Sequence, residues 1–165
     1  MRYLMPYPIL LLASAVATAQ DIPKDLDVYG EVYPAACKAK EREALKASLM
    51  ALNEPDTQKL WQAIETVLCG PGTAANERLV KQMLASRVKA TDEGTGSEPS
   101  VQRRPPTLEL ARDLMAKGQA WSASLVRQDE GLELQYWPNE ACVYGVTFVY
   151  RSKRWWISQT GSACD

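Results

Sequence analysis

Apolar residues in the first half of the chain recur at intervals of three and four, which is the spacing of an amphipathic helix. The first two such stretches are separated by Asn53-Glu54-Pro55-Asp56, and the second ends at Gly70-Pro71-Gly72. A third helix is predicted to begin near Thr73. The residues expected to be buried on these helices are Leu45, Leu49, Leu52, Leu60, Trp61, Ile64, Val67, Leu68, Leu79, Val80, Met83, Leu84 and Val88.

The pattern then changes. Residues 91–106 are rich in Gly, Ser, Pro and charged residues, a composition typical of a mobile linker. A short helix is expected over residues 108–117, with Gly118 directly after it.

Apolar and polar residues alternate in the last part of the chain, as they do in half-buried β-strands. Gly131, Pro138-Asn139 and Ser152-Lys153 interrupt the alternation and are typical turn residues. We therefore expect an antiparallel meander of four strands. These strands cover residues 120–127, 132–137, 142–150 and 154–160.

The last hairpin can be placed in register. If Ser152-Lys153 is a two-residue turn, Tyr150 faces Trp155 and Phe148 faces Ile157. One face of the sheet is then apolar and is expected to pack against the helices. It carries Trp121, Leu125, Leu132, Leu134, Tyr136, Tyr144, Val146, Phe148, Tyr150, Trp155 and Ile157. The other face carries Thr147, Val149, Arg151, Arg154, Trp156, Ser158 and Thr160.

The chain has four cysteines, which in an exported protein indicate two disulfides. Cys37 and Cys69 lie at equal distances from the turn near residue 53, which places them side by side in an antiparallel helix pair. Cys142 and Cys164 are expected to form the second bond. The hairpin register sets Cys142 opposite Ala163, so this bond requires a bulge or a frayed end. Four cysteines allow three connectivities, and the spacing alone leaves all three open.

The first nineteen residues have the pattern of a cleavable signal peptide. A basic residue, Arg2, precedes a short apolar run, and Ala17-Thr18-Ala19 supplies small residues before the expected cut. The remaining residues, 20–165, suffice for one domain: a helical part (20–90), the linker (91–106), and a helix with its sheet (107–165). We expect a periplasmic or secreted protein without a stable membrane anchor.

Charge and composition exclude several functions. Without Arg2 there are 18 basic and 20 acidic residues, which argues against general binding to nucleic acid. The chain has no histidine, so catalytic triads and histidine-ligated metal sites are excluded. We expect neither a metal nor a cofactor. Ser86 and Lys89 fit a short Ser-x-x-Lys pattern, but its companion motifs are missing, and we interpret them as a solvated helix end.

A cluster in the last hairpin is the best candidate for a binding surface. It comprises Arg151, Lys153, Arg154 and Trp156, flanked on the same face by Thr147 and Ser158. An outward tryptophan beside arginine is a favoured anchor in protein interfaces. The alternative is that Trp156 packs beneath another part of the chain.

These observations predict an α+β protein with a disulfide-stapled helical hairpin, a third helix, a fourth helix and an antiparallel meander. The order of elements, rather than any motif, resembles that of the NTF2-like and cystatin-like superfolds. The first functional hypothesis is a small exported module that binds another envelope protein, such as an inhibitor, a toxin-immunity protein or an accessory subunit. The alternatives are a carrier of a small apolar ligand between helices and sheet, and a histidine-free hydrolase of the cell envelope.

Overall fold

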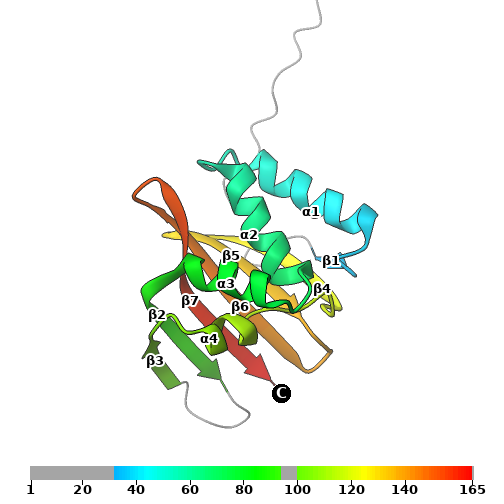
Figure 1. Cartoon of the computed structure of the whole chain (residues 1–165). Helices are drawn as coiled ribbons and strands as arrows, with labels where there is room; N and C mark the ends of the chain where they lie inside the picture. Colours follow the sequence, from blue (N-terminus) through cyan, green and yellow to red (C-terminus); the bar gives the residue numbers. More distant parts are fainter. Residues whose placement is uncertain (1–31, 94–99, 165) are drawn as a thin grey trace, which may run out of the picture.

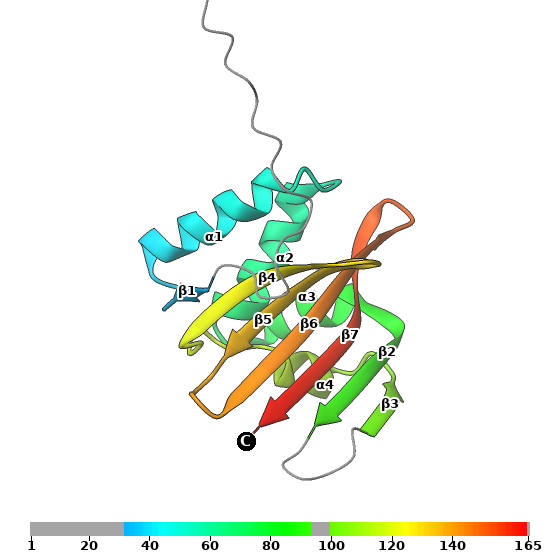
Figure 2. The same ribbon diagram turned by 180° about the vertical axis from the view of Figure 1, so that it is seen from behind.

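The computed structural model describes residues 32–93 and 100–164, and it forms four helices and one seven-stranded sheet. The predicted signal peptide and most of the lead-in lie outside the described residues. The strands run in the order β1-β4-β5-β6-β7-β2-β3, and all four helices lie on one face of the sheet (Figures 1 and 2). The elements are β1 (Tyr33–Pro34), α1 (Ala39–Ala51), α2 (Thr57–Cys69), α3 (Ala74–Met83), β2 (Leu84–Glu93), β3 (Ser100–Arg104), α4 (Leu108–Asp113), β4 (Ser122–Gln128), β5 (Gly131–Trp137), β6 (Cys142–Arg151) and β7 (Arg154–Cys164).

The prediction of a long third helix followed by a linker was wrong. Helix α3 ends at Met83, and the chain continues directly into β2, which pairs in parallel with β7. Leu84 and Val88 are buried as expected, but from a strand, and Leu79 is 43% exposed. Strand β3 then pairs antiparallel with β2, so residues 91–93 and 100–104 belong to the sheet. Pairing with a strand some seventy residues away outweighed the local composition.

The four predicted strands correspond to β4 to β7, which are neighbours in the sheet. The sheet is nevertheless wider than a meander, because β1 adds to one edge while β2 and β3 add to the other. The predicted helix over residues 108–117 is shorter and ends at Asp113. Its N-terminus is capped by the Thr107 hydroxyl, which accepts a hydrogen bond from the Leu110 amide at 3.1 Å.

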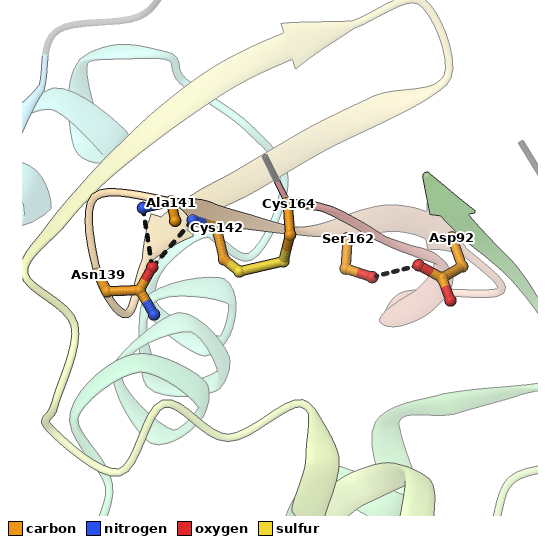
Figure 3. Close-up of a disulfide and its surroundings, with 6 residues drawn as sticks. All are labelled: Asp92, Asn139, Ala141, Cys142, Ser162 and Cys164. Atoms are coloured by element: carbon orange, nitrogen blue, oxygen red, sulfur yellow. Dashed lines mark hydrogen bonds between the residues drawn. A yellow bond between two sulfur atoms is a disulfide. The ribbon is translucent and has the colours of Figure 1, made fainter. Parts of the chain in front are cut away.

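Both expected disulfides are present. Cys37 is bonded to Cys69, with their Cα atoms 5.4 Å apart, so α1 and α2 are joined at one end by the turn and at the other by a covalent bond. The second bond joins Cys142 to Cys164 at the end of the last hairpin (Figure 3). Beside it, the Asn139 side chain accepts hydrogen bonds from the Ala141 and Cys142 amides and so holds the preceding turn.

The turn between α1 and α2 is hydrogen-bonded to residues near the tip of the last hairpin. The Trp155 indole donates to the Pro55 carbonyl at 2.8 Å, and the Tyr150 hydroxyl donates to the Asp56 carboxylate at 3.3 Å. Loss of solvent and the negative charge of Asp56 raise the pKa of Tyr150 above its ordinary value. These contacts fix the helical layer against the sheet.

The core lies between the helices and the sheet, and most of the expected residues fill it. Phe148, Leu134 and Ile157 from the sheet meet Leu45 and Ile64 from the helices, and each is fully buried.

Two predictions about which residues lie on each face of the sheet were wrong. Trp121 precedes β4 and is 55% exposed, while Thr160 is buried on the helix side at 6% exposure.

A β-bulge explains the position of Thr160. Near the turn, Arg151 pairs with Arg154 and Phe148 pairs with Ile157. This part of the β6–β7 pairing follows the register of a two-residue turn. It then shifts by one residue, so Thr147 pairs with Gln159 and Cys142 pairs with Cys164. Ser158 is the extra residue. The bulge that the disulfide requires is therefore present, and every residue of β7 after it faces the opposite side from the simple prediction.

The disulfides should contribute measurably to stability. For loops of 32 and 22 residues, the chain-entropy model gives about 3 to 4 kcal/mol each. We expect the Cys37→Ser/Cys69→Ser and Cys142→Ser/Cys164→Ser variants each to lose stability of this order in urea unfolding. A loss below about 1 kcal/mol for either pair would contradict this account.

An ion pair between α3 and α4 should make stability depend on acidity. Arg112 donates to both Glu77 carboxylate oxygens, at 2.9 and 3.1 Å, and this contact lowers the pKa of Glu77 from its ordinary value. Because the folded pKa is lowered, the contribution is present above the unfolded pKa and is lost as pH falls through the folded one. We expect Glu77→Gln to flatten the loss of stability between about pH 5 and 3. Urea unfolding at a series of pH values measures this change, and Glu43→Gln at an exposed position of α1 is the control, because Glu43 is not part of the Glu77–Arg112 pair.

Candidate functional site

The largest described hollow lies on the sheet face that none of the four helices covers (Figure 2). It forms where two adjacent strands both depart from regular pairing. Strand β7 carries the Ser158 bulge, and the β2–β7 register shifts between Leu84 and Lys89, where five steps along β2 match two along β7. Bulges of this kind separate strands locally and redirect side chains, and here they open a groove.

We call this hollow the cationic groove. Its volume is about 760 Å³, and it is open to solvent. It is lined by Leu84, Ala85, Ser86, Arg87, Lys89, Arg103, Glu130, Val149, Arg151, Ser152, Trp156, Ser158 and Gln159.

The lining is strongly positive in a chain whose net charge is −1. Arg87, Lys89, Arg103 and Arg151 are opposed by one carboxylate, that of Glu130. Glu130 lies 3.6 Å from Arg151 in an exposed ion pair. Among the described residues, the other three cations have no carboxylate within 4.0 Å. The groove therefore holds three cations that form no ion pair with a described residue.

Trp156 forms one wall of the groove and is held in place from two sides. Its indole donates to the Arg151 carbonyl at 3.2 Å, and the Arg154 guanidinium lies 3.8 Å above its ring. Arg154 also donates to the Gln82 carbonyl at 2.7 Å, near the end of α3. A cation at this end of a helix satisfies a carbonyl that has no partner within the helix.

The structure thus separates the six predicted binding residues. Arg151, Trp156 and Ser158 line the groove. Thr147 lies beside it, paired with Gln159, and its carbonyl accepts from the Ser158 hydroxyl at 3.5 Å. Lys153 is exposed in the two-residue turn, and Arg154 supports Trp156 and α3.

Sequence reasoning missed Arg87, Lys89 and Arg103. The first two were assigned to a solvated helix end and the third to the linker, whereas they lie on β2 and β3. Lys89 pairs directly with Arg103 and with Gln159. One signal was available: Arg87 and Lys89 alternate with Val88 and Ala90, the period of a strand.

A smaller hollow, of about 340 Å³, lies on the helix side between α4 and the β2–β3 hairpin. Tyr144 and Leu110 line it together with charged residues, Asp92, Arg104 and Asp113. Arg104 lies 3.8 Å from Asp113, and Asp92 accepts from the Ser162 hydroxyl at 3.3 Å. A lining of this composition suits a polar group better than an apolar ligand.

Comparison with known proteins yields one distant structural neighbour. No family model matches the sequence, and no curated protein matches it significantly. The crystal structure of an NTF-2 like protein of unknown function from Silicibacter pomeroyi DSS-3 aligns with 76% of this chain and 98% of its own. The identity is 12% and the TM-score is 0.35, so function must be argued from the geometry of this chain.

The two disulfides indicate a protein that lies outside the cytoplasm, because such bonds persist in oxidising compartments. Within the described residues, no helix has the length and hydropathy needed to cross a membrane.

The role assigned to Arg154 can be tested separately from binding. We expect Arg154→Ala to reduce stability by about 1 kcal/mol, because it removes both the ring contact and the hydrogen bond to α3. Lys153→Gln is the matched control. It removes the neighbouring charge but no described contact, so its unfolding midpoint in urea should equal that of the wild type. Equal midpoints for both variants would refute the supporting role.

Proposed function

We propose that this protein is an exported binding protein that holds an acidic segment of a partner protein in the cationic groove. The observation that carries the proposal is the gathering of Arg87, Lys89, Arg103 and Arg151 in one open hollow. Like charges repel one another when brought together, so such a cluster is costly unless an anionic group binds there. An inhibitor, a toxin-immunity protein and an accessory subunit would each use such a surface.

The groove has the features of a protein-binding site rather than of a small-molecule pocket. It is open to solvent, and it offers an aromatic side chain beside exposed arginines, the residue types enriched where proteins bind most tightly. Trp156 is already ordered by Arg151 and Arg154, so little conformational freedom would be lost on binding. The positive lining would also accelerate encounter with an acidic partner.

The two alternative functions have less support. The space between the helices and the middle of the sheet is filled by the core, and the hollow beside α4 carries charged side chains. Asp92 and Asp113 both line that hollow, yet each already contacts a neighbour, Ser162 or Arg104. Neither arrangement favours an apolar ligand or a pair of catalytic carboxylates over the groove.

The proposal predicts salt-sensitive binding of an acidic peptide. The probe is a fluorescein-labelled peptide of ten glutamates, and the protein is residues 20–165 with both disulfides intact. Fluorescence anisotropy should show binding that weakens as salt rises. The Arg87→Gln/Arg103→Gln variant should bind about three- to tenfold more weakly, since exposed ion pairs contribute roughly 0.2 to 1 kcal/mol each.

The control is Arg78→Gln/Lys81→Gln. It removes the same charge from exposed positions of α3, on the helix side of the molecule. It should retain nearly all of the affinity. Equal losses in the two variants would mean that the peptide senses only net charge. That result, or tighter binding of polygalacturonate or a DNA decamer than of the peptide, would overturn the proposal.

A further inference from the structure

A second hollow adjoins the cationic groove on the same sheet face. Its volume is about 320 Å³, and Gln159 lines both hollows. Gly145 and Gly161 line it and pair directly across β6 and β7, and Thr91 of β2 pairs with Gly161. The Glu133 side chain covers Gly145, so Gly161 forms the open floor. Because Gly161 has no side chain, the sheet surface is lower at this residue than at its neighbours. The second hollow therefore begins directly beside the cationic groove.

The fold does not require a glycine at position 161. Gly118 is the one glycine with a positive φ among the described residues, so the backbone at 161 suits any residue. A Cβ there would come no closer than 3.7 Å to its nearest neighbour, the Thr91 carbonyl oxygen, an ordinary contact. Glycine inside a strand weakens the sheet, and it commonly marks a place where a ligand or another backbone approaches closely.

The rim of this second hollow differs chemically from the first. It carries Thr91, Gln135 and Gln159, which offer hydroxyl and amide groups, beside the carboxylate of Glu133. A glutamine side chain both donates and accepts hydrogen bonds, as a peptide group does. A ligand that spans both hollows therefore meets cations at one end, and hydroxyl and amide groups with a single carboxylate at the other.

We propose that the two hollows form one elongated site for an extended peptide chain. An acidic stretch of the partner occupies the cationic groove, and its backbone continues over Gly161 toward the Cys142–Cys164 disulfide, beside the Glu133 side chain that covers Gly145. This inference rests on the proposed function and specifies the form of the ligand. From Trp156 to Ala163 the site runs about 20 Å, the length of six or seven extended residues.

The experiment compares two labelled peptides. The short probe is five glutamates. The long probe adds five alternating alanine and serine residues, and it is made in both orders so that either chain direction can be accommodated. In the wild-type protein, one order of the long probe should bind at least threefold more tightly than the short probe.

The decisive variant is Gly161→Val, which fills the floor without changing charge. It should remove the advantage of the long probe, leave the short probe unaffected and leave the thermal unfolding midpoint unchanged or higher. Ala75→Val is the control, because it adds bulk at an exposed position of α3 on the helix side of the molecule, outside both hollows, and it should retain the whole advantage. Gly161→Ala should give an intermediate loss.

The outcomes separate this inference from the one on which it rests. If Gly161→Val binds the long probe as tightly as the wild type does, or if the long probe has no advantage, the elongated site is wrong. The proposal that the cationic groove binds an acidic segment would then be unaffected, because the charge variants test it separately. If the wild-type protein binds neither probe, both proposals are wrong.

Discussion

The β6–β7 hairpin must satisfy two registers at once, and the rest of the structure depends on how it does so. At one end, Ser152 and Lys153 have positive φ values and form a two-residue turn that pairs Arg151 with Arg154. At the other end, the disulfide pairs Cys142 with Cys164, one residue further along β7. A single register cannot meet both demands, and the Ser158 bulge absorbs the difference. The groove lies at this bulge.

The register shift between β2 and β7 adds to the local separation of strands that the Ser158 bulge causes. Because β2 also departs from β7 between Leu84 and Lys89, the two strands are displaced at the same place along the sheet. Leu84 itself is buried and anchors β2 beside Ile157, and regular pairing resumes at Lys89 and Gln159. The core is thus undisturbed on the helix side, while the opposite face is opened. The helix side supplies the stability, and the opposite face is free to vary in shape and charge.

Local patterns predicted the register of the last hairpin at its turn, favoured the two disulfide pairings that are present, and required either a bulge or a frayed end beside the second. Each depends on residues close in sequence or on a geometric rule with few solutions, as with Cys37 and Cys69 placed equally far from one turn. Strand β2 was missed because Val80, Met83, Leu84 and Val88 fit a helical face as well as they fit a helix followed by a strand. Its partner, β7, lies about seventy residues away, and no local pattern records that pairing. The site was incomplete for the same reason, since three of its four cations come from β2 and β3.

Net charge is a poor guide to the kind of partner that we propose, because it sums over surfaces that act separately. Carboxylates such as Glu54, Glu65 and Glu77 are committed to ion pairs with Arg127, Arg42 and Arg112. They cancel those cations in the total, yet they form no ion pair with Arg87, Lys89 or Arg103 of the groove. At an ionic strength near 0.15 M, exposed charges interact only over about 8 Å. The partner that we propose would therefore respond to the charges lining the groove rather than to the total for the chain.

The bulge is also favoured by the side chains of β7, independently of the disulfide. If the register of the turn continued to the end of the hairpin, Gln159 would face Val146 inside the core and Thr160 would face solvent. The buried amide of a glutamine would then lack hydrogen-bond partners, which costs more than burying the smaller threonine. The bulged register instead buries Thr160 beside Val146 and turns Gln159 outward. The same side chain thereby lines both hollows of the proposed site. The register that keeps the glutamine amide out of the core is therefore also the register that shapes the proposed binding surface.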